Sequence, residues 1–197
     1  MSSDTTTIAV YDAKFADYVN LEDSEWRNPS LDRFVEMLPK GAHVLDLGCG
    51  PGKTSAFLQK AGFTVDATDA SIAMVKVAAE KYGIPVRHAT FDDITAQAEY
   101  DGIWANFSLL HAPKSKMPTH LAALHKALKP GGAFHIGMKL GTGEHRDRLD
   151  RFYAYYSQTE LEDLLKDAGF HTLNATFGNG TGLDGSRSDW IVITAHA

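Results

Sequence analysis

Apolar positions along most of the chain alternate between two spacings, one typical of strands and one typical of helices. Short runs rich in Val, Ile, Leu and Phe predict strands at residues 43–47, 63–68, 86–89, 101–107 and 133–139. Between these runs, apolar residues recur three and four positions apart, which predicts helices from about residue 53, over 72–82 and around 118–128. Strands that alternate with single helices indicate βαβ units and a mostly parallel sheet.

Capping residues mark the ends of these helices. Ser71 is the expected N-cap of the helix over 72–82, whose inner stripe is expected to be Ile72, Val75 and Ala79. Ser157 and a glutamate three residues later form a capping box for one more helix, which Gly169 ends.

The end of the chain departs from this alternation. Residues 171–177 and 190–196 are two strand-like runs, and the stretch 178–188, rich in Gly, Asn, Ser and Asp, joins them without a helical pattern. Strands joined without a crossover helix pair antiparallel. We therefore expect an α/β fold with a doubly wound, Rossmann-like sheet, mostly parallel with a C-terminal antiparallel hairpin, and with helices on both faces.

The first forty residues read as a helical lead-in. One apolar stripe consists of Tyr11, Phe15, Tyr18 and Val19, and a second helix introduced by Pro29 and Ser30 carries Leu31, Phe34, Val35 and Leu38. We expect residues 1–40 to cap a domain over residues 41–197, so that the 197-residue chain is a single domain overall.

Composition limits the partners and the cell compartment that we expect for the chain. The chain has 19 basic and 25 acidic residues, a formal charge of −6 and one cysteine, Cys49. One cysteine excludes an internal disulfide, and the acidic balance argues against a nucleic-acid or anionic-membrane partner. The polar start and the lack of about 18 consecutive apolar residues predict neither a signal peptide nor a membrane span. We expect a cytoplasmic monomer or dimer.

A glycine-rich loop follows the first predicted strand. Residues 44–52 read Val-Leu-Asp-Leu-Gly-Cys-Gly-Pro-Gly, and such glycines permit a sharp strand–helix turn and close approach of a ligand. Asp69 lies 21 residues beyond Gly48 (69 − 48), at the end of the second predicted strand. An acid there accepts hydrogen bonds from ribose hydroxyls in nucleotide-binding α/β folds, although it can also cap the next helix.

Both NAD and S-adenosylmethionine (SAM) fit a glycine loop followed by such an acid. The dinucleotide fingerprint is G-x-G-x-x-G, whereas this loop is Gly48-x-Gly50-x-Gly52 with a proline inside it. An acid, Asp46, also precedes the loop within the strand, and a C-terminal hairpin is foreign to a parallel dinucleotide sheet. These features favour SAM.

At this point the chain resembles the class I SAM-dependent methyltransferases, and in particular small bacterial members of unassigned substrate. The resemblance covers about residues 40–197 and rests on residues 44–52, 69–71, 91–93, 100–106, 128–132 and a tyrosine-rich stretch from Arg151 to Leu161. It implies SAM as the cofactor and methyl transfer as the activity.

The resemblance also implies roles for individual residues. Asp46, Gly48, Cys49 and Gly50 would surround the methionyl end of SAM. The ribose diol would meet Asp69, and the adenine would lie near Ala70, Met74 and Phe91, with Asp92 or Asp93 accepting from its amino group. Asn106 would face the transferable methyl group, and Tyr11 and Tyr18 would fold over the cofactor. Core packing for Met74, helix packing for the tyrosines and a surface turn or cap for the paired acids are the structural alternatives.

Catalysis calls for few protein groups, because the cofactor carries the reactivity and the protein mainly aligns the acceptor. His111, just after the fourth predicted strand, is the candidate general base, with a structural histidine as the alternative. His145, Arg146 and Tyr153 follow the fifth strand, and the charge alternation over residues 144–151 predicts a solvated loop. The nine histidines show no metal-ligand spacing, so no metal is expected.

Four functions remain open from the sequence. The first is SAM-dependent methyl transfer to a small-molecule acceptor by in-line displacement. The others are an RNA methyltransferase that needs a partner, a non-catalytic SAM-binding module and an NAD dehydrogenase. The residues of the sequence leave the acceptor atom undetermined among oxygen, nitrogen, sulfur and carbon.

Overall fold

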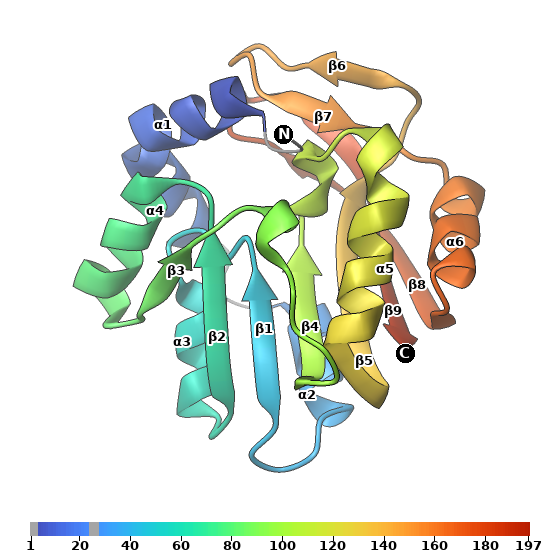
Figure 1. The fold of residues 1–197 in the computed structure, drawn as a ribbon. Coiled ribbons are helices and arrows are strands. Elements are labelled where there is room, and N and C mark those ends of the chain that lie inside the picture. The colour runs from blue at the N-terminus through green and yellow to red at the C-terminus, as the bar shows by residue number, and fades with distance from the viewer. Residues whose placement is uncertain (1–3, 24–27) are drawn as a thin grey trace.

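The computed structural model describes residues 4–23 and 28–197, which build one seven-stranded sheet flanked by helices (Figure 1). The strand order is β3-β2-β1-β4-β5-β9-β8. The strands are β1 His43–Leu47, β2 Thr64–Asp69, β3 Val86–His88, β4 Tyr100–Asn106, β5 Leu128–Lys139, β8 His171–Thr181 and β9 Arg187–His196.

The directions of the strands confirm the expected fold class. β1 pairs in parallel with β2 and β4, and the pairs β2–β3 and β4–β5 are parallel too. β9 runs antiparallel to both β5 and β8, so the sheet ends in the C-terminal hairpin that the missing crossover helix predicted. The order reverses at β1, between β2 and β4, and in open α/β sheets ligands bind at the carboxyl edge beside such a switch point.

Helices cover both faces of the sheet. They are α1 Thr5–Asp23, α2 Pro29–Glu36, α3 Lys53–Lys60, α4 Ile72–Val77, α5 Met117–Ala127 and α6 Gln158–Asp167. Helices α2 and α3 pack against Val44, Val65 and Trp104 on one face, while the other face packs against α5 and α6. Short turns of other helix types cover residues 78–82, 91–93, 109–111 and 114–116.

Two segments lie across the carboxyl edge of the sheet. Figure 1 shows α1 and a small hairpin, β6 Glu144–Arg146 with β7 Phe152–Ala154, above the ends of β1, β2 and β4. Both segments come from the parts of the sequence that lie outside the βαβ alternation. The fold thereby encloses a space between the strand ends and this cover.

Capping residues behave as expected at two helices. The Ser71 hydroxyl accepts from the Met74 amide at 3.2 Å, and Ser157 and Glu160 form the predicted capping box. The face of α4 differs from the expected one, because Met74 and Ala78 are buried whereas Ile72 is 44% exposed. The Ala78 methyl group packs where the glycine loop approaches, since a Cβ on Gly52 would lie 2.9 Å from it.

The boundaries of three strands, and the position of one aromatic residue on a helix, also differ from what the sequence predicts. The C-terminal strands extend to Thr181 and back from Arg187, so most of the predicted loop 178–188 is strand, and Trp190 covers Gly178 with its indole ring. β5 begins at Leu128, before the glycines that were expected to precede it. In α1, Phe15 is 40% exposed because the helix kinks at Lys14, which turns Phe15 out of the stripe that contains Tyr11 and Tyr18.

Candidate functional site

A cavity of about 730 Å³, partly open to solvent, lies beneath α1 at the carboxyl edge of the sheet. This volume includes space that is open to solvent at the mouth of the cavity. Nine residues that the sequence singled out line it: Tyr11, Tyr18, Gly48, Gly50, Asp69, Ala70, Met74, Phe91 and His111. The lining also includes residues that sequence reasoning missed, among them Asp4, Thr7, Ile8, Thr68, Thr90, Phe107 and Ser108.

The glycine loop forms one wall of the cavity. Gly48 and Gly50 have φ angles of +70° and +55°, a region in which a side chain is strained. The amides of Gly48 and Cys49 both donate to the Thr68 carbonyl, at 2.8 and 2.9 Å, which ties the loop to β2. A Cβ on Gly48 would collide with the Cβ of Ser108, so only glycine allows this approach to the end of β4.

Asp69 stands at the end of β2 and faces the cavity. Its carboxylate accepts from the Gly50 amide at 2.8 Å and from the Ser71 amide at 2.8 Å. Burial raises the pKa of Asp69, and these two backbone hydrogen bonds oppose the rise. Each carboxylate oxygen has lone pairs beyond the one already used, so the group can still accept from hydroxyl donors in the cavity.

Asp46 and Cys49 lie behind the glycine loop and are not among the residues that line the cavity. Asp46 is 2% exposed and accepts from the Ser55 hydroxyl at 2.6 Å, and burial raises its pKa to about 7. Cys49 is 8% exposed and packs with Ala67, Ala78 and Ile84. Both side chains are therefore buried beneath the loop, outside the cavity lining.

The predicted adenine-contacting residues divide into two groups. Ala70, Met74 and Phe91 line the cavity, whereas Asp92 and Asp93 are exposed and lie outside its lining. The Asp93 carboxylate accepts from the Thr90 amide at 2.7 Å and from the Thr90 hydroxyl at 2.8 Å, in a capping box for the turn 91–93. The structure therefore places Asp93 in the capping role that the sequence offered as the alternative.

The end of β4 presents Phe107 and Ser108 to the cavity rather than Asn106. Asn106 lies outside the lining, and its Oδ1 accepts from Nε2 of His135 at 3.0 Å. Phe107 has a φ of +55°, a strained value for an aromatic residue, and strain of this kind clusters at functional sites. The Ser108 hydroxyl is buried and has no hydrogen-bond partner among the described residues, which leaves it available to a ligand.

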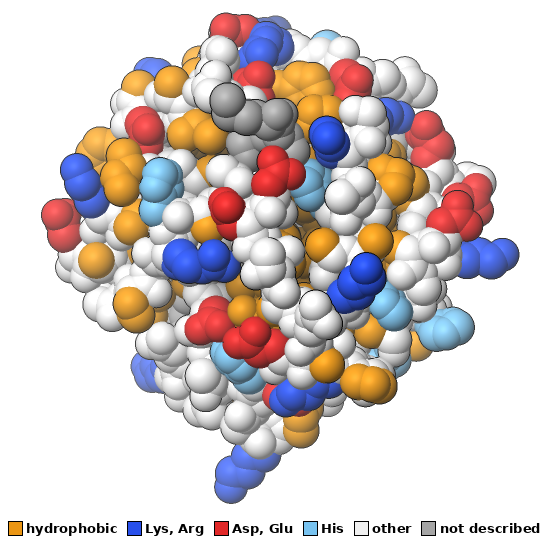
Figure 2. Space-filling view, in the orientation of Figure 1, with side chains coloured by type: hydrophobic (Ala, Val, Ile, Leu, Met, Phe, Trp, Pro, Cys, Tyr) orange, Lys and Arg blue, Asp and Glu red, His pale blue; other side chains and the backbone are white. Residues whose placement is uncertain are grey.

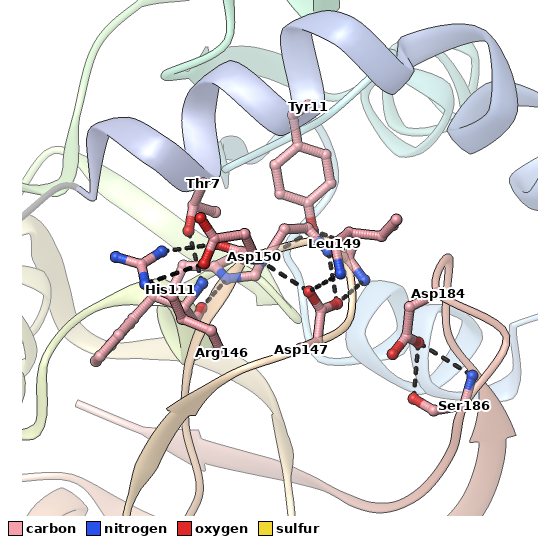
Figure 3. A network of polar contacts seen from close by, with 11 residues as sticks. Thr7, Tyr11, His111, Arg146, Asp147, Leu149, Asp150, Asp184 and Ser186 are labelled. Atoms are coloured by element: carbon pink, nitrogen blue, oxygen red, sulfur yellow. Dashed lines mark hydrogen bonds and ion pairs between the residues drawn. The ribbon is translucent and has the colours of Figure 1, made fainter.

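Helix α1 covers the cavity through three contacts with the β6–β7 hairpin. Asp4 pairs with Arg146 at 2.7 Å, the Thr7 hydroxyl accepts from the Phe152 amide at 2.8 Å, and Arg151 donates to the Tyr11 hydroxyl at 3.0 Å (Figure 3). Thr7 and Tyr11 are four positions apart and so share one face of α1, and Asp4 directly precedes the helix. No apolar periodicity marks this polar face, which explains why the sequence did not reveal it.

The other side of α1 is attached to α4. The Asp12 carboxylate accepts from the Ser71 hydroxyl at 2.6 Å and from the Ala73 amide at 3.0 Å. A negative side chain at the start of a helix is favoured by the helix dipole. The cover over the cavity is thus held on both sides by polar contacts.

His111 lies at the end of a directed chain of hydrogen bonds. Its Nδ1 is 2.7 Å from the Phe152 carbonyl, which can only accept, so Nδ1 carries a proton. Its Nε2 is 2.9 Å from the Tyr11 hydroxyl, which itself accepts from Arg151. In the neutral ring Nε2 therefore accepts from Tyr11. Burial lowers the pKa of His111 to about 4, with the positive charge of Arg151 contributing, so the ring is neutral near pH 7.

Arg151 corrects the expectation of a solvated loop over residues 144–151. Its side chain is 2% exposed and donates to Oδ2 of Asp147 from both Nε, at 2.9 Å, and Nη2, at 2.6 Å. Figure 3 shows Asp147 below the ring of Tyr11. The alternation of charge signals a local ion pair that α1 and the hairpin bury together, and the sequence alone gives no sign of that burial. His145 stacks on Tyr155 outside the cavity lining, at a ring-centroid distance of 4.2 Å.

One group of potential metal ligands occurs in the described part of the chain, away from the cavity. His43, Asp66 and Glu99 each place a ligand atom within 4.8 Å of the others. His43 Nε2 is 3.1 Å from Asp66, whose carboxylate also accepts from the Tyr100 hydroxyl at 3.0 Å. None of the three lines the cavity, so the group takes no part in the site described above.

Comparison with known proteins adds to this geometry. The family model described as a methyltransferase domain matches residues 44–132. The O-methyltransferase cnsE of Penicillium expansum is 31% identical over 186 residues, which cover 77% of this chain and 65% of that protein. The malonyl-[acyl-carrier protein] O-methyltransferase of Pseudescherichia vulneris is 34% identical over 96 residues, covering 47% and 37%. The chain thus spans less than two thirds of the length of these relatives.

Solved structures show the same fold. The 1,6-didemethyltoxoflavin-N1-methyltransferase of Burkholderia thailandensis, with bound 1,6-didemethyltoxoflavin and S-adenosylhomocysteine, has a TM-score of 0.70 at 24% identity, covering 95% of this chain and 87% of that one. A TehB-like SAM-dependent methyltransferase of Corynebacterium glutamicum has a TM-score of 0.71 at 20% identity, covering 95% and 98%. Among the described residues, no helix combines the length and apolar character that crossing a bilayer requires.

Proposed function

From the premise that this chain belongs to the class I, Rossmann-like SAM-dependent methyltransferases, we propose that it transfers a methyl group from SAM to a small-molecule acceptor. The observation that carries the proposal is the meeting of the glycine loop, Asp69 and the buried Ser108 hydroxyl in one cavity at the switch point of the sheet. The methyltransferase domain match spans the loop, Asp69 and the end of β4.

The lining of the cavity suits SAM in its chemistry. The loop of Gly48 and Gly50 leaves backbone open for the methionyl end, with Asp46 and Cys49 supporting it from behind. Asp69 is an acceptor for the ribose diol, and Ala70, Met74 and Phe91 provide apolar surface for the adenine. Tyr18 lies against the loop, since a Cβ on Gly50 would be 3.5 Å from its ring. When bound, the cofactor supplies a methyl group on a positively charged sulfur that a nucleophile displaces in line.

The acceptor in this proposal enters between the end of β4 and the β6–β7 hairpin, where His111 and Tyr11 lie. Both nitrogens of His111 are engaged, so His111 acts through the Tyr11 hydroxyl rather than directly. For an acceptor that arrives protonated, the acceptor proton passes to the Tyr11 oxygen as the Tyr11 proton passes to Nε2. A base of low pKa suffices, because a nucleophile becomes strongly acidic as it gains a methyl group.

The proposal gives no direct cofactor contact to Asp92, Asp93 and Asn106, which lie outside the lining of the cavity. Asp92 and Asp93 reach the adenine only if the turn 91–93 moves, because Asp93 is held by Thr90. Asn106 acts by fixing the position of β4 through His135, which stacks on Trp104 at a centroid distance of 3.5 Å. Backbone and side chain of Phe107 and Ser108 then take the place nearest the acceptor.

The small-molecule acceptor agrees with the charge of the chain. The formal charge is −6, and on the face in Figure 2 acidic and basic side chains are interspersed rather than grouped by sign. A nucleic-acid substrate would call for a continuous basic surface. We place the protein in the cytoplasm, with which its single, buried cysteine is compatible.

The test is calorimetric titration of the full chain with SAM, with S-adenosylhomocysteine and with NAD. We expect both sulfur compounds to bind and NAD to bind far more weakly. Asp69→Ala is expected to weaken the binding of S-adenosylhomocysteine roughly tenfold or more, whereas Asp163→Ala, a matched loss of one exposed carboxylate on α6, leaves that binding unchanged. A folded sample that binds neither sulfur compound contradicts the proposal. Binding without formation of S-adenosylhomocysteine across a broad acceptor panel favours a non-catalytic module instead.

A further inference from the structure

Lys139 lies at the end of a strand beside the cavity, outside its lining, and its ammonium group is not paired with an acid among the residues that the structure describes. It is the last residue of β5, and β5 pairs with β4 so that Gly137 is opposite Asn106. The end of β5 therefore lies beside Phe107 and Ser108, which line the cavity. On the other side Lys139 is opposite Trp190 of β9.

The surroundings of the Lys139 ammonium group are aromatic. Its Nζ lies 4.0 Å from the centroid of the Tyr153 ring, and that ring lies 4.6 Å from the ring of His111. The rings of Phe107, which follows β4, and of Trp190 in β9 lie 6.2 Å apart, on the two strands that flank β5. Lys139 is half-buried, and burial together with the charge of Arg151 lowers its pKa. An anion beside the ammonium group would therefore stabilise its charged form in place of the water that burial removes.

The nearby acids are already used by other groups. The Asp147 carboxylate receives hydrogen bonds from Arg151 and from the Leu149 amide, and Asp184 receives them from the amide and the hydroxyl of Ser186 (Figure 3). In the described part of the chain, the Lys139 ammonium group has neither a hydrogen bond nor an ion pair, and it lies over the Tyr153 ring and close to Gly182. By contrast, Lys129 at the other end of β5 pairs with Asp101 at 2.8 Å.

We propose that Lys139 binds a carboxylate of the methyl acceptor, whose apolar body lies against Tyr153, Phe107 and Trp190. The inference rests on the proposed function and names its substrate class, a small organic acid with a flat or aromatic body. The ammonium group supplies charge-assisted hydrogen bonds to the carboxylate. The Tyr153 ring lies 4.0 Å from the Lys139 Nζ and 4.6 Å from the His111 ring, so the proposed carboxylate contact is one ring away from the Tyr11–His111 pair, which remains with the methyl-accepting atom.

The test uses the full chain saturated with S-adenosylhomocysteine and matched pairs of acids and amides at fixed ionic strength. The pairs are benzoate with benzamide, phenylacetate with phenylacetamide and cinnamate with cinnamamide, titrated by calorimetry. We expect at least one acid to bind roughly tenfold or more tightly than its amide. Lys139→Met removes the preference, and Lys139→Arg keeps most of it. Lys129→Met, which changes the net charge equally, leaves the preference intact.

Two results overturn this inference while the proposed function stands. One is that no acid in any pair is preferred over its amide; the other is that the preference survives in Lys139→Met. An unchanged dissociation constant of S-adenosylhomocysteine shows that the Lys139→Met variant is folded. Failure of SAM and S-adenosylhomocysteine to bind the unmodified chain is a separate result, and it contradicts the proposed function itself.

Discussion

The Tyr11 hydroxyl lies 2.9 Å from Nε2 of His111, although one hundred residues separate them in the sequence. This contact joins the helix that covers the cavity to the turn that follows β4. Arg151, which donates to the same hydroxyl at 3.0 Å, adds the β6–β7 hairpin to the contact. Three segments that are distant in sequence thus meet at one phenol oxygen, at the edge of the candidate site.

Tyr11→Phe removes that oxygen and leaves Nε2 of His111 and one Arg151 donor without their partner. A buried polar group that loses its partner costs about 1–3 kcal/mol, so we expect the free energy of unfolding to fall by that amount. The methyl-transfer rate is expected to fall roughly 100-fold, the lower range of general acid–base catalysis. Urea unfolding and single-turnover kinetics measure the two effects.

Phe15→Leu is the control for this change, because Phe15 lies on the same helix and is 40% exposed. We expect it to leave both the stability and the rate within experimental error of the unmodified chain. An equal loss in the two variants would mean that α1 acts only as a packed cover, without a specific role for the Tyr11 hydroxyl.

The low pKa of His111 leads us to a second prediction, on how stability depends on pH. In the folded chain the pKa is about 4, below the value of about 6.5 for an unfolded histidine. The unfolded state therefore binds more protons between these values, and His111 lowers stability as the pH falls from about 6.5 to 4, by at most about 1.4 kcal/mol per pH unit. NMR of the imidazole nitrogens is expected to show a neutral ring at pH 6, protonated at Nδ1. A ring that is charged at pH 6 contradicts the hydrogen-bond chain.

Much of the sheet could be predicted because its signals are local. The central parallel strands β1 and β4 are short runs of mostly apolar residues, and capping residues such as Ser71 and Ser157 act within a few residues of themselves. The hairpin was predictable from a missing helical pattern, but its length was not. β8 and β9 extend to Thr181 and Arg187 because Trp190 packs over Gly178, and that contact forms only after the strands pair.

The residues of the candidate site differ in the same way: some could be predicted from the local sequence, and others depend on contacts between distant segments. Gly48, Gly50 and Asp69 were predictable because motif spacing along the chain places them, and the structure brings them together. Arg151 was not, because its burial depends on α1 lying over the hairpin, a contact between segments about 140 residues apart. Asp93 was predicted with two alternatives, and the local one, a cap for the turn 91–93, is present in the structure.

Asp46 is expected to act on stability in the direction opposite to His111. Its folded pKa is about 7, above the unfolded value of about 3.9, so its stabilising effect is complete at low pH and is lost as the pH rises through 7. Asp46→Asn keeps the acceptor for the Ser55 hydroxyl and removes the titration. Relative to the unmodified chain, this variant is therefore expected to gain on the order of 2 kcal/mol in unfolding free energy between pH 5 and pH 8. Chemical unfolding at both pH values measures it, and an equal difference at the two would show that Asp46 does not titrate in this range.

Gly48 and Gly41 form a matched pair that separates backbone strain from close approach. Their φ angles are +70° and +73°, so an alanine at either position carries a similar strain of about 1–2 kcal/mol. A Cβ on Gly41 meets nothing within 4 Å, whereas one on Gly48 would collide with the Cβ of Ser108, where the loop meets the end of β4. Gly41→Ala is therefore expected to lower stability modestly and to leave the dissociation constant of S-adenosylhomocysteine unchanged. Gly48→Ala is expected to raise that constant roughly tenfold or more, because the loop must withdraw from β4. Equal constants for the two variants in calorimetry would place the cofactor away from this loop.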